Sequence, residues 1–148
     1  MSLESKIMDA MKIAMKEKDK VALESLRAIK SQLLLLKTDG TTSEVSPEQE
    51  IALLQRLVKQ RKEAYEQFKA NQREELAENE LAQSKVIEQF LPAQLSVEDL
   101  ETELKKIIEE TEAKDIKDLG KVMGAATKKL QGKADGKIIS ETVRKLLS

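Results

Sequence analysis

Glycine and lysine are concentrated in one short segment near the end of the chain, where their types and spacing suit contact with a phosphate backbone. Four of the five glycines fall within residues 120–136. A glycine inside a helix costs about 1 kcal/mol relative to alanine, so its use there indicates that another group approaches closely. The surrounding lysines would attract an anion. The candidate contact residues are Lys117, Gly120, Lys121, Gly124, Lys128, Gly132, Lys133, Gly136 and Lys137.

Gly120 and Gly124 are spaced to lie one turn apart on the same helix face, which would open a flat surface to another backbone. A neighbouring helix of the same domain could pack there closely. A nucleic-acid backbone could instead be held there by the lysines. Backbone amides around Asp135, at the start of the last helix, could add hydrogen bonds to phosphate, although the Asp135 side chain competes for them as a cap. Both interpretations stay open at this point.

Other patterns argue against catalysis and metal binding. The chain has no histidine and no cysteine, which removes the commonest general base, metal ligands and thiolate chemistry. The string GKADGK, residues 132–137, lacks the spacing of a nucleotide-hydrolysing phosphate loop and follows no predicted strand. The carboxylates of residues 74–80 have no histidine partner and suggest neither a metal site nor an acid–base pair. We therefore predict no catalytic residue, metal or cofactor.

Two further clusters have structural explanations. A basic cluster at residues 56–62 is followed by Glu63 and Glu66, so pairs within the same helix are the expected use of its cations. Methionines near the start of the chain could line an adaptable groove, but at helical spacing they more often fill a core. These methionines are Met1, Met8, Met11 and Met15.

Composition predicts an all-α protein. The 148 residues are 40% hydrophobic and 36% charged, and only three are aromatic, so the core must be aliphatic. The net charge of −1 is unevenly distributed: residues 1–37 carry +3, residues 38–113 carry −9 and residues 114–148 carry +5. A polyanion would therefore contact the two ends rather than the acidic middle. No apolar run is long enough for a membrane span and the start lacks signal-peptide form, so we expect a cytoplasmic location without membrane contact.

The first half of the chain predicts an N-terminal helical bundle over residues 1–91. A first helix runs from Leu3 to about Lys18, and Asp19 caps a second helix that stops at Gly40. After a loop at residues 41–46, Ser46 and Gln49 form a capping box around Pro47 and open a long third helix. A turn near residue 71 leads to a fourth helix. The expected core includes Leu3, Ile7, Met11, Ala14, Met15, Leu26, Ile29, Leu33, Leu54, Leu57, Val58, Leu76 and Ile87.

Pro92 disfavours helical conformation at Leu91, which places the domain boundary there and leaves residues 92–148 as a small three-helix domain. Ser96, with Asp99 three residues later, opens its first helix. Asp118 starts the next helix, which carries Gly120 and Gly124 and is expected to end at Gly132. Asp135 caps the last helix. The expected core includes Leu100, Leu104, Ile107, Ile108, Ile138, Ile139, Val143, Leu146 and Leu147.

Three motifs resemble the signature of the GatB/YqeY family. They are the runs Phe90–Leu95, FLPAQL, then Gly120–Gly124, GKVMG, and Gly132–Gly136, GKADG. The length and domain plan are similar to those of a stand-alone YqeY-like protein. The resemblance implies a two-domain all-α fold like the tail of the GatB subunit of tRNA-dependent amidotransferase, a carbon–nitrogen ligase that uses glutamine as amide donor. In that enzyme the tail engages the tRNA body, whereas a separate domain is catalytic.

Nothing in this chain matches that catalytic domain, so the resemblance implies a tRNA-binding module of translation without its own chemistry. Lysines would neutralise phosphates while the glycine face admits the backbone. Two alternatives remain. An accessory protein of an amidotransferase or aminoacyl-tRNA synthetase complex would use an exposed apolar patch on the N-terminal helices. A structural adaptor would use the glycines only for helix packing.

Overall fold

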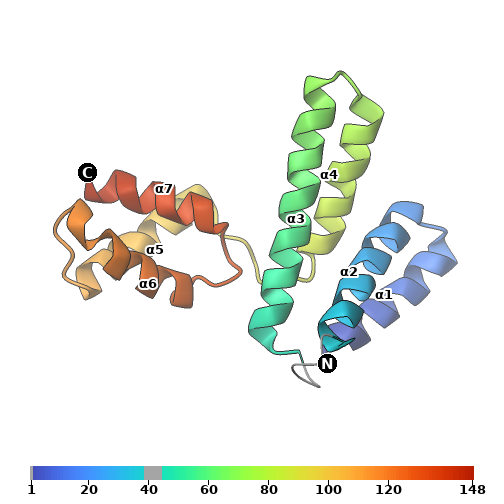
Figure 1. Ribbon diagram of the computed structural model, residues 1–148, viewed down its shortest axis with the longest axis horizontal. Coiled ribbons are helices and arrows are strands. Elements are labelled where there is room, and N and C mark those ends of the chain that lie inside the picture. The colour runs from blue at the N-terminus through green and yellow to red at the C-terminus, as the bar shows by residue number, and fades with distance from the viewer. Residues whose placement is uncertain (1, 39–44) are drawn as a thin grey trace. The chain divides into compact units, whose positions relative to one another are not determined.

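Seven α-helices and one short 3-10 helix make up the ordered elements of residues 2–38 and 45–148, which the computed structural model describes (Figure 1). No β-strand occurs within these residues, so the all-α prediction is confirmed. The elements are α1 (Leu3–Glu17), α2 (Lys20–Thr38), α3 (Pro47–Ala70), α4 (Glu74–Glu88), α5 (Val97–Glu110), η1 (Ile116–Asp118), α6 (Leu119–Lys129) and α7 (Gly136–Leu147).

Contacts divide the chain into two compact units, Met1–Leu91 and Pro92–Ser148. The division falls at the Leu91–Pro92 bond, where proline restrains the preceding backbone. That each unit folds as an independent domain stays a prediction. They are called below the N-terminal unit and the C-terminal unit.

Helix starts follow local side-chain chemistry. The Ser46 side chain accepts a hydrogen bond from the Gln49 N–H, and the Gln49 side chain accepts one from the Ser46 N–H, so the predicted capping box is present with Pro47 in the first turn. Ser96 and Asp135 cap α5 and α7, and the Asp19 carboxylate accepts a hydrogen bond from the N–H of Ala22, the third residue of α2. Each cap satisfies a backbone donor that has no partner inside its helix.

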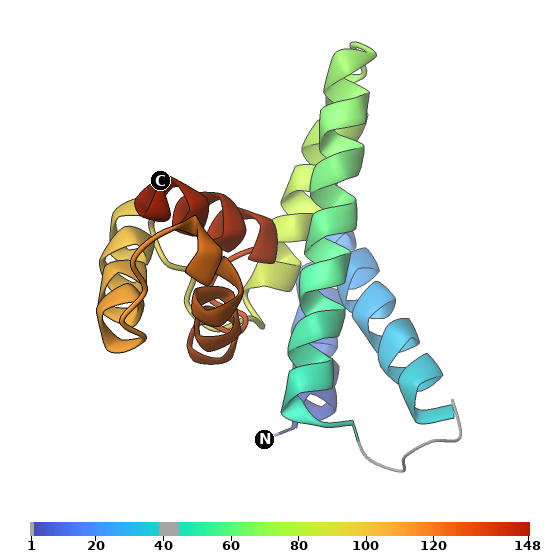
Figure 2. The same cartoon turned by 60° about the vertical axis from the view of Figure 1, so that its left-hand side comes forward.

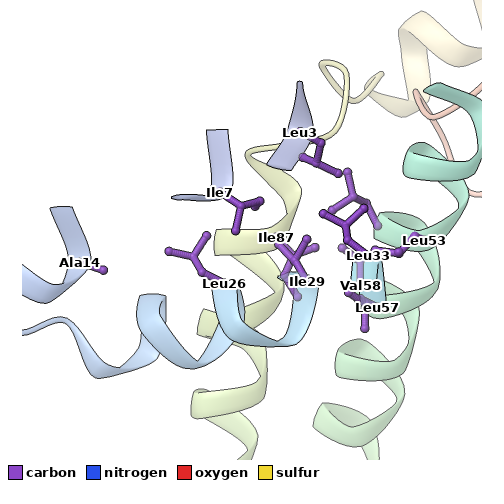
Figure 3. Packing of buried hydrophobic residues seen from close by; sticks show 11 residues of the cluster. Leu3, Ile7, Ala14, Leu26, Ile29, Leu33, Leu53, Leu57, Val58 and Ile87 are labelled. Carbon is purple, nitrogen blue, oxygen red and sulfur yellow. The ribbon is translucent and has the colours of Figure 1, made fainter. Parts of the chain in front are cut away.

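The N-terminal unit is built from two helical hairpins. α1 and α2 form one, and the longer α3–α4 hairpin packs against α2 and extends beyond the first hairpin in both views (Figures 1 and 2). Figure 3 shows Ile29 of α2 beside Ile87 of α4, with Leu33 near the α3 residues Leu53 and Leu57. All five side chains are buried. Because α2 lies between α1 and the α3–α4 hairpin, it joins the whole unit.

A polar layer crosses the N-terminal unit. The buried Gln83 side chain of α4 accepts a hydrogen bond from Arg61 Nε of α3 at 3.0 Å and donates one to the Glu24 carboxylate of α2 at 3.2 Å. Arg61 also lies 3.7 Å from Glu80. Polar groups in a core favour the one arrangement that satisfies them, so this layer sets the register of the three helices.

The C-terminal unit packs α5, α6 and α7 around an aliphatic core. Val122 and Ala126 of α6 are fully buried, as are Leu104 of α5 and Val143 of α7. This unit contains no aromatic side chain, since Tyr65, Phe68 and Phe90 all precede residue 92. Close packing of small and branched residues therefore supplies its core.

Several sequence predictions were wrong in detail. Met15, Leu76 and Ile138 were expected in the core but are exposed, because each lies on a side of its helix that no neighbouring helix covers. α6 ends at Lys129 rather than at Gly132. The predicted stop of the second helix at Gly40 and most of the 41–46 loop lie outside the described residues.

Candidate nucleic-acid interface

One face of α6, with the turn before it, carries most of the predicted contact residues. Lys117, Gly120, Lys121, Gly124 and Lys128 are all exposed. Their positions repeat at three, four and seven residues, which places them along one side of the helix. The opposite side of α6 holds the unit together through its buried apolar residues. We call these five exposed residues the α6 face.

The two glycines of the α6 face are open. A Cβ added at Gly120 or at Gly124 would meet no atom within 4 Å beyond the local helix itself. The interpretation that a neighbouring helix of the same domain packs against these glycines is therefore wrong. Since helix propensity disfavours glycine at both positions, the intramolecular packing of the C-terminal unit does not explain their presence.

The predicted contact lysines have no ion-pair partner among the described residues, whereas three other lysines of this unit do. Lys129 pairs with Glu110 at 2.9 Å, Lys145 with Glu101 at 3.4 Å and Lys106 with Glu103 at 3.7 Å. The predicted contact lysines without such a partner are Lys117, Lys121, Lys128, Lys133 and Lys137, and Lys105 and Lys114 of this unit also have none among the described residues. A cation without an intramolecular partner can neutralise a ligand phosphate without first breaking an ion pair.

Asp118 closes the turn that leads into α6. Its carboxylate accepts a hydrogen bond from the Lys114 N–H at 2.8 Å instead of capping α6, although the helix does begin next to it. That hydrogen bond, then a second backbone hydrogen bond within the turn and the charge of Lys121, lower the pKa of Asp118 below its usual value. The carboxylate therefore stays ionised near the α6 face and reduces its positive potential at the N-terminal end.

Gly132, which was predicted to contact RNA, is instead buried and shapes the backbone of the C-terminal unit. Its φ of 78° lies in the left-handed region that glycine adopts without strain. Its carbonyl accepts a hydrogen bond from the Gln94 side chain at 2.6 Å, and the next carbonyl, of Lys133, accepts one from the Leu95 N–H at 2.9 Å. The first and third family-like motifs are therefore joined to each other, a contact that sequence reasoning missed because residues 94 and 132 are far apart in the chain.

The Asp135 cap limits what the start of α7 offers to an anion. Gly136 and Lys137 are exposed, and a Cβ at Gly136 would also meet open space. However, the Lys137 N–H already donates to the Asp135 carboxylate at 2.9 Å. The predicted competition of the Asp135 cap is therefore present at this amide, and the Lys133 and Lys137 side chains remain as candidate contacts.

The basic cluster on α3 serves the N-terminal unit, but not as predicted. Its cations bond to other helices instead of pairing within α3: Arg56 with Gln32 of α2, and Lys62 with Glu88 of α4 at 3.0 Å. Arg61 belongs to the polar layer. These contacts join α2, α3 and α4, and thereby explain part of the cluster without a ligand.

Neither a metal site nor a membrane span is found in the part of the chain that the structure describes. No group of three or more acidic, histidine or cysteine side chains could hold a metal ion there. None of the helices in that part has the length and apolarity needed to cross a bilayer.

Comparison with known families gives a match over nearly the whole chain. The family model described as Yqey-like protein matches residues 4–147 of this chain. The chain belongs to the YqeY family. This match includes all three motifs that carried the resemblance and extends over both units, from α1 to the end of α7. A search among curated proteins found no match.

Proposed function

We propose that this YqeY protein binds tRNA through the C-terminal unit, with the α6 face as the centre of the contact. The observation that carries the proposal is the pair of open glycines among lysines that have no ion-pair partner in the described residues. Glycine at both positions lets a sugar–phosphate backbone approach the helix surface, and the lysines Lys117, Lys121 and Lys128 supply charge along it. Lys133 and Lys137 extend this set beyond α6.

Charge distribution within the C-terminal unit supports an anionic ligand. Residues 92–148 carry equal numbers of acidic and basic side chains, so the unit has no net charge. Residues 114–148 nevertheless carry nine basic and four acidic side chains, because the acidic residues are concentrated in and around α5. Attraction of a polyanion would therefore be directed to α6, α7 and their connection.

The absence of aromatic residues from 92–148 favours shape recognition of a base-paired RNA stem. Proteins that read single-stranded RNA stack its bases on aromatic rings, and this unit has none to offer. Lysines contact phosphates irrespective of the base sequence. A folded tRNA presents stems of this kind, so the proposed contact would lie on the body of the tRNA.

The relation to tRNA-dependent amidotransferases belongs to the same proposal. By its resemblance to the GatB tail, the protein would act in translation in the cytoplasm as a binding module, and the carbon–nitrogen ligase chemistry with glutamine as amide donor would belong to another polypeptide. We assign no catalytic residue. A second candidate function, an adaptor in an amidotransferase or aminoacyl-tRNA synthetase complex, is favoured by exposed apolar residues on α1 and α2, which are considered below.

The test is a salt series of tRNA binding with two matched triple variants. Lys121, Lys128 and Lys133 change to Ala in the first variant. The control changes the three ion-paired lysines, Lys106, Lys129 and Lys145, and therefore alters the net charge by the same amount. Each lost phosphate contact should reduce the log–log salt slope by about 0.7–0.9.

We expect the first variant to lose affinity and to show a slope that is shallower by about 2–3, while the control retains both. A DNA duplex of similar charge should bind more weakly than tRNA at every salt concentration. Equal losses in the two variants would mean that only net charge matters, and the α6 face would then not be the contact surface. Failure of the unmodified protein to bind tRNA would refute the function itself.

A further inference from the structure

A groove between α1 and α2 of the N-terminal unit has an apolar floor and exposed apolar walls. Ile7 and Leu33 form its floor and belong to the buried core. Met8 and Leu34 form its walls and remain 41% and 61% exposed. An outward helix face normally carries polar residues, so two large apolar side chains beside a hollow indicate a surface that another molecule covers.

The leucine run on α2 explains why folding alone cannot bury this surface. Residues 33–36 are all leucine, and four consecutive helical residues point around the full circumference of the helix. Leu33 faces the core, while Leu34 and Leu35 face outward. The intramolecular packing of α2 therefore requires only part of this run, and the exposed leucines need another explanation.

The charges around the groove favour an acidic partner. At one end Lys37 of α2 forms an ion pair with Glu4 of α1, and both side chains keep substantial exposure. Lys30 lines the groove without an ion-pair partner among the described residues. Of the other carboxylates of this hairpin, Asp19 caps α2 and Glu24 bonds to Gln83, while Asp9 and Glu17 of α1 do not line the groove. The rim thus has one cation without a partner, Lys30, and a second cation, Lys37, that a stronger acceptor on a partner could draw away from Glu4.

The length of the groove along α2 suits two turns of a bound helix. Its α2 wall runs from Lys30 to Lys37, which is about 10 Å or two helical turns. Apolar side chains at positions i, i+3 or i+4, and i+7 of a bound helix span the same length. Methionine suits such a contact because its side chain adapts to different apolar shapes.

We propose that the α1–α2 groove binds one amphipathic helix of a partner protein, with apolar anchors at helical spacing and carboxylates beside them that face Lys30 and Lys37. A concave surface favours inserted side chains over a flat lipid surface. Residues 38–91, which include α3 and α4, carry seven basic and eleven acidic side chains, and this net charge of −4 disfavours an anionic membrane. This inference concerns the N-terminal unit and does not depend on RNA binding by the other unit.

The experiment is a selection from a display library of helical peptides whose flanking positions vary between acidic and basic residues. The full-length protein is the target and its Leu34→Glu variant is the counter-target. Ile13→Glu is the matched control, since Ile13 of α1 is 57% exposed and does not line the groove. Because both substituted side chains are more than half exposed, circular dichroism should show unchanged helix content in both variants.

We expect enriched peptides with acidic flanks that bind at least about tenfold more weakly to Leu34→Glu and equally well to Ile13→Glu. In methyl spectra, the bound peptide should shift the Met8 signal and leave that of Met15 unchanged, since Met15 is exposed but outside the groove. Enrichment of basic flanks, or no enrichment over the counter-target, would overturn the proposal. Self-association or binding to anionic vesicles that Leu34→Glu abolishes would also overturn it, in favour of a second copy or a membrane.

Discussion

Replacing the two glycines of the α6 face by alanine should make the protein more stable and a weaker tRNA binder at the same time. Gly124 is the sixth of the eleven residues of α6, where alanine should gain about 1 kcal/mol from helix propensity. Gly120 is the second residue, in the first turn, so about 0.5 kcal/mol is expected there. The added methyl groups meet no neighbour within 4 Å, so no steric cost opposes this gain.

The double variant should therefore gain about 1.5 kcal/mol, which corresponds to about a tenfold change in the unfolding equilibrium. Amide hydrogen exchange resolves this gain because it reports on α6 itself, where protection should rise by that factor in amides that exchange by unfolding of the C-terminal unit. Binding to tRNA is measured on the same samples. If a phosphate backbone lies against the glycines, two methyl groups would hold it away. Affinity should then fall by tenfold or more, since a hydrogen bond to a charged group contributes ~1.5–3 kcal/mol.

Thr102→Ala on α5 is the matched control. It replaces an exposed residue of lower helix propensity by alanine and stabilises the same unit by about 0.5 kcal/mol, away from α6. Its tRNA affinity should stay unchanged. A double glycine variant that is less stable than the unmodified protein would refute the reading of α6 as an open face. A variant that is more stable but binds tRNA normally would refute close approach at the glycines.

Two further predictions concern the turns on either side of α6. Gly132→Ala should destabilise the C-terminal unit by about 1–2 kcal/mol in urea unfolding, because alanine is strained at a φ of 78°. Gly136→Ala, which adds the same methyl group in open space at ordinary φ, should not destabilise it, and equal losses would contradict the backbone explanation. The pKa of Asp118, lowered first by the Lys114 N–H, should be measured below its usual value by NMR titration and should rise in Lys121→Ala. A carboxylate with a lowered pKa stabilises the folded state at pH values above its unfolded-state pKa. Asp118→Asn should therefore be fully destabilising at neutral pH, and the difference in stability should vanish as the pH falls through the folded-state pKa. A loss of stability that does not depend on pH would contradict this explanation.

Helix starts could be predicted from sequence because a cap depends on residues three positions apart. Ser46 with Gln49, and Ser96 with the amide of Asp99, make their hydrogen bonds within one turn whatever the rest of the chain does. Burial was harder to predict because it depends on which helices lie alongside. Leu53 is buried but was not among the expected core residues, and Met15 is exposed although it shares the apolar stripe of α1.

The candidate site divides in the same way. From sequence alone came the concentration of glycine and lysine between residues 117 and 137, the lack of histidine and cysteine, and the motifs that led to the family. These are properties of residue type and order, which need no packing. Sequence could not distinguish glycines that admit a helix from glycines that face open space, because that depends on where α5 and α7 lie.

The tertiary structure alone decided three matters. Gly120 and Gly124 face open space, and an apolar groove lies between α1 and α2. Gly132 is buried with a left-handed backbone conformation, and its carbonyl accepts a hydrogen bond from Gln94. Each depends on atoms that are distant in the chain and meet only after the helices pack. Local sequence sets each helix and its caps, whereas the contacts between helices determine which of its faces remains available to a partner.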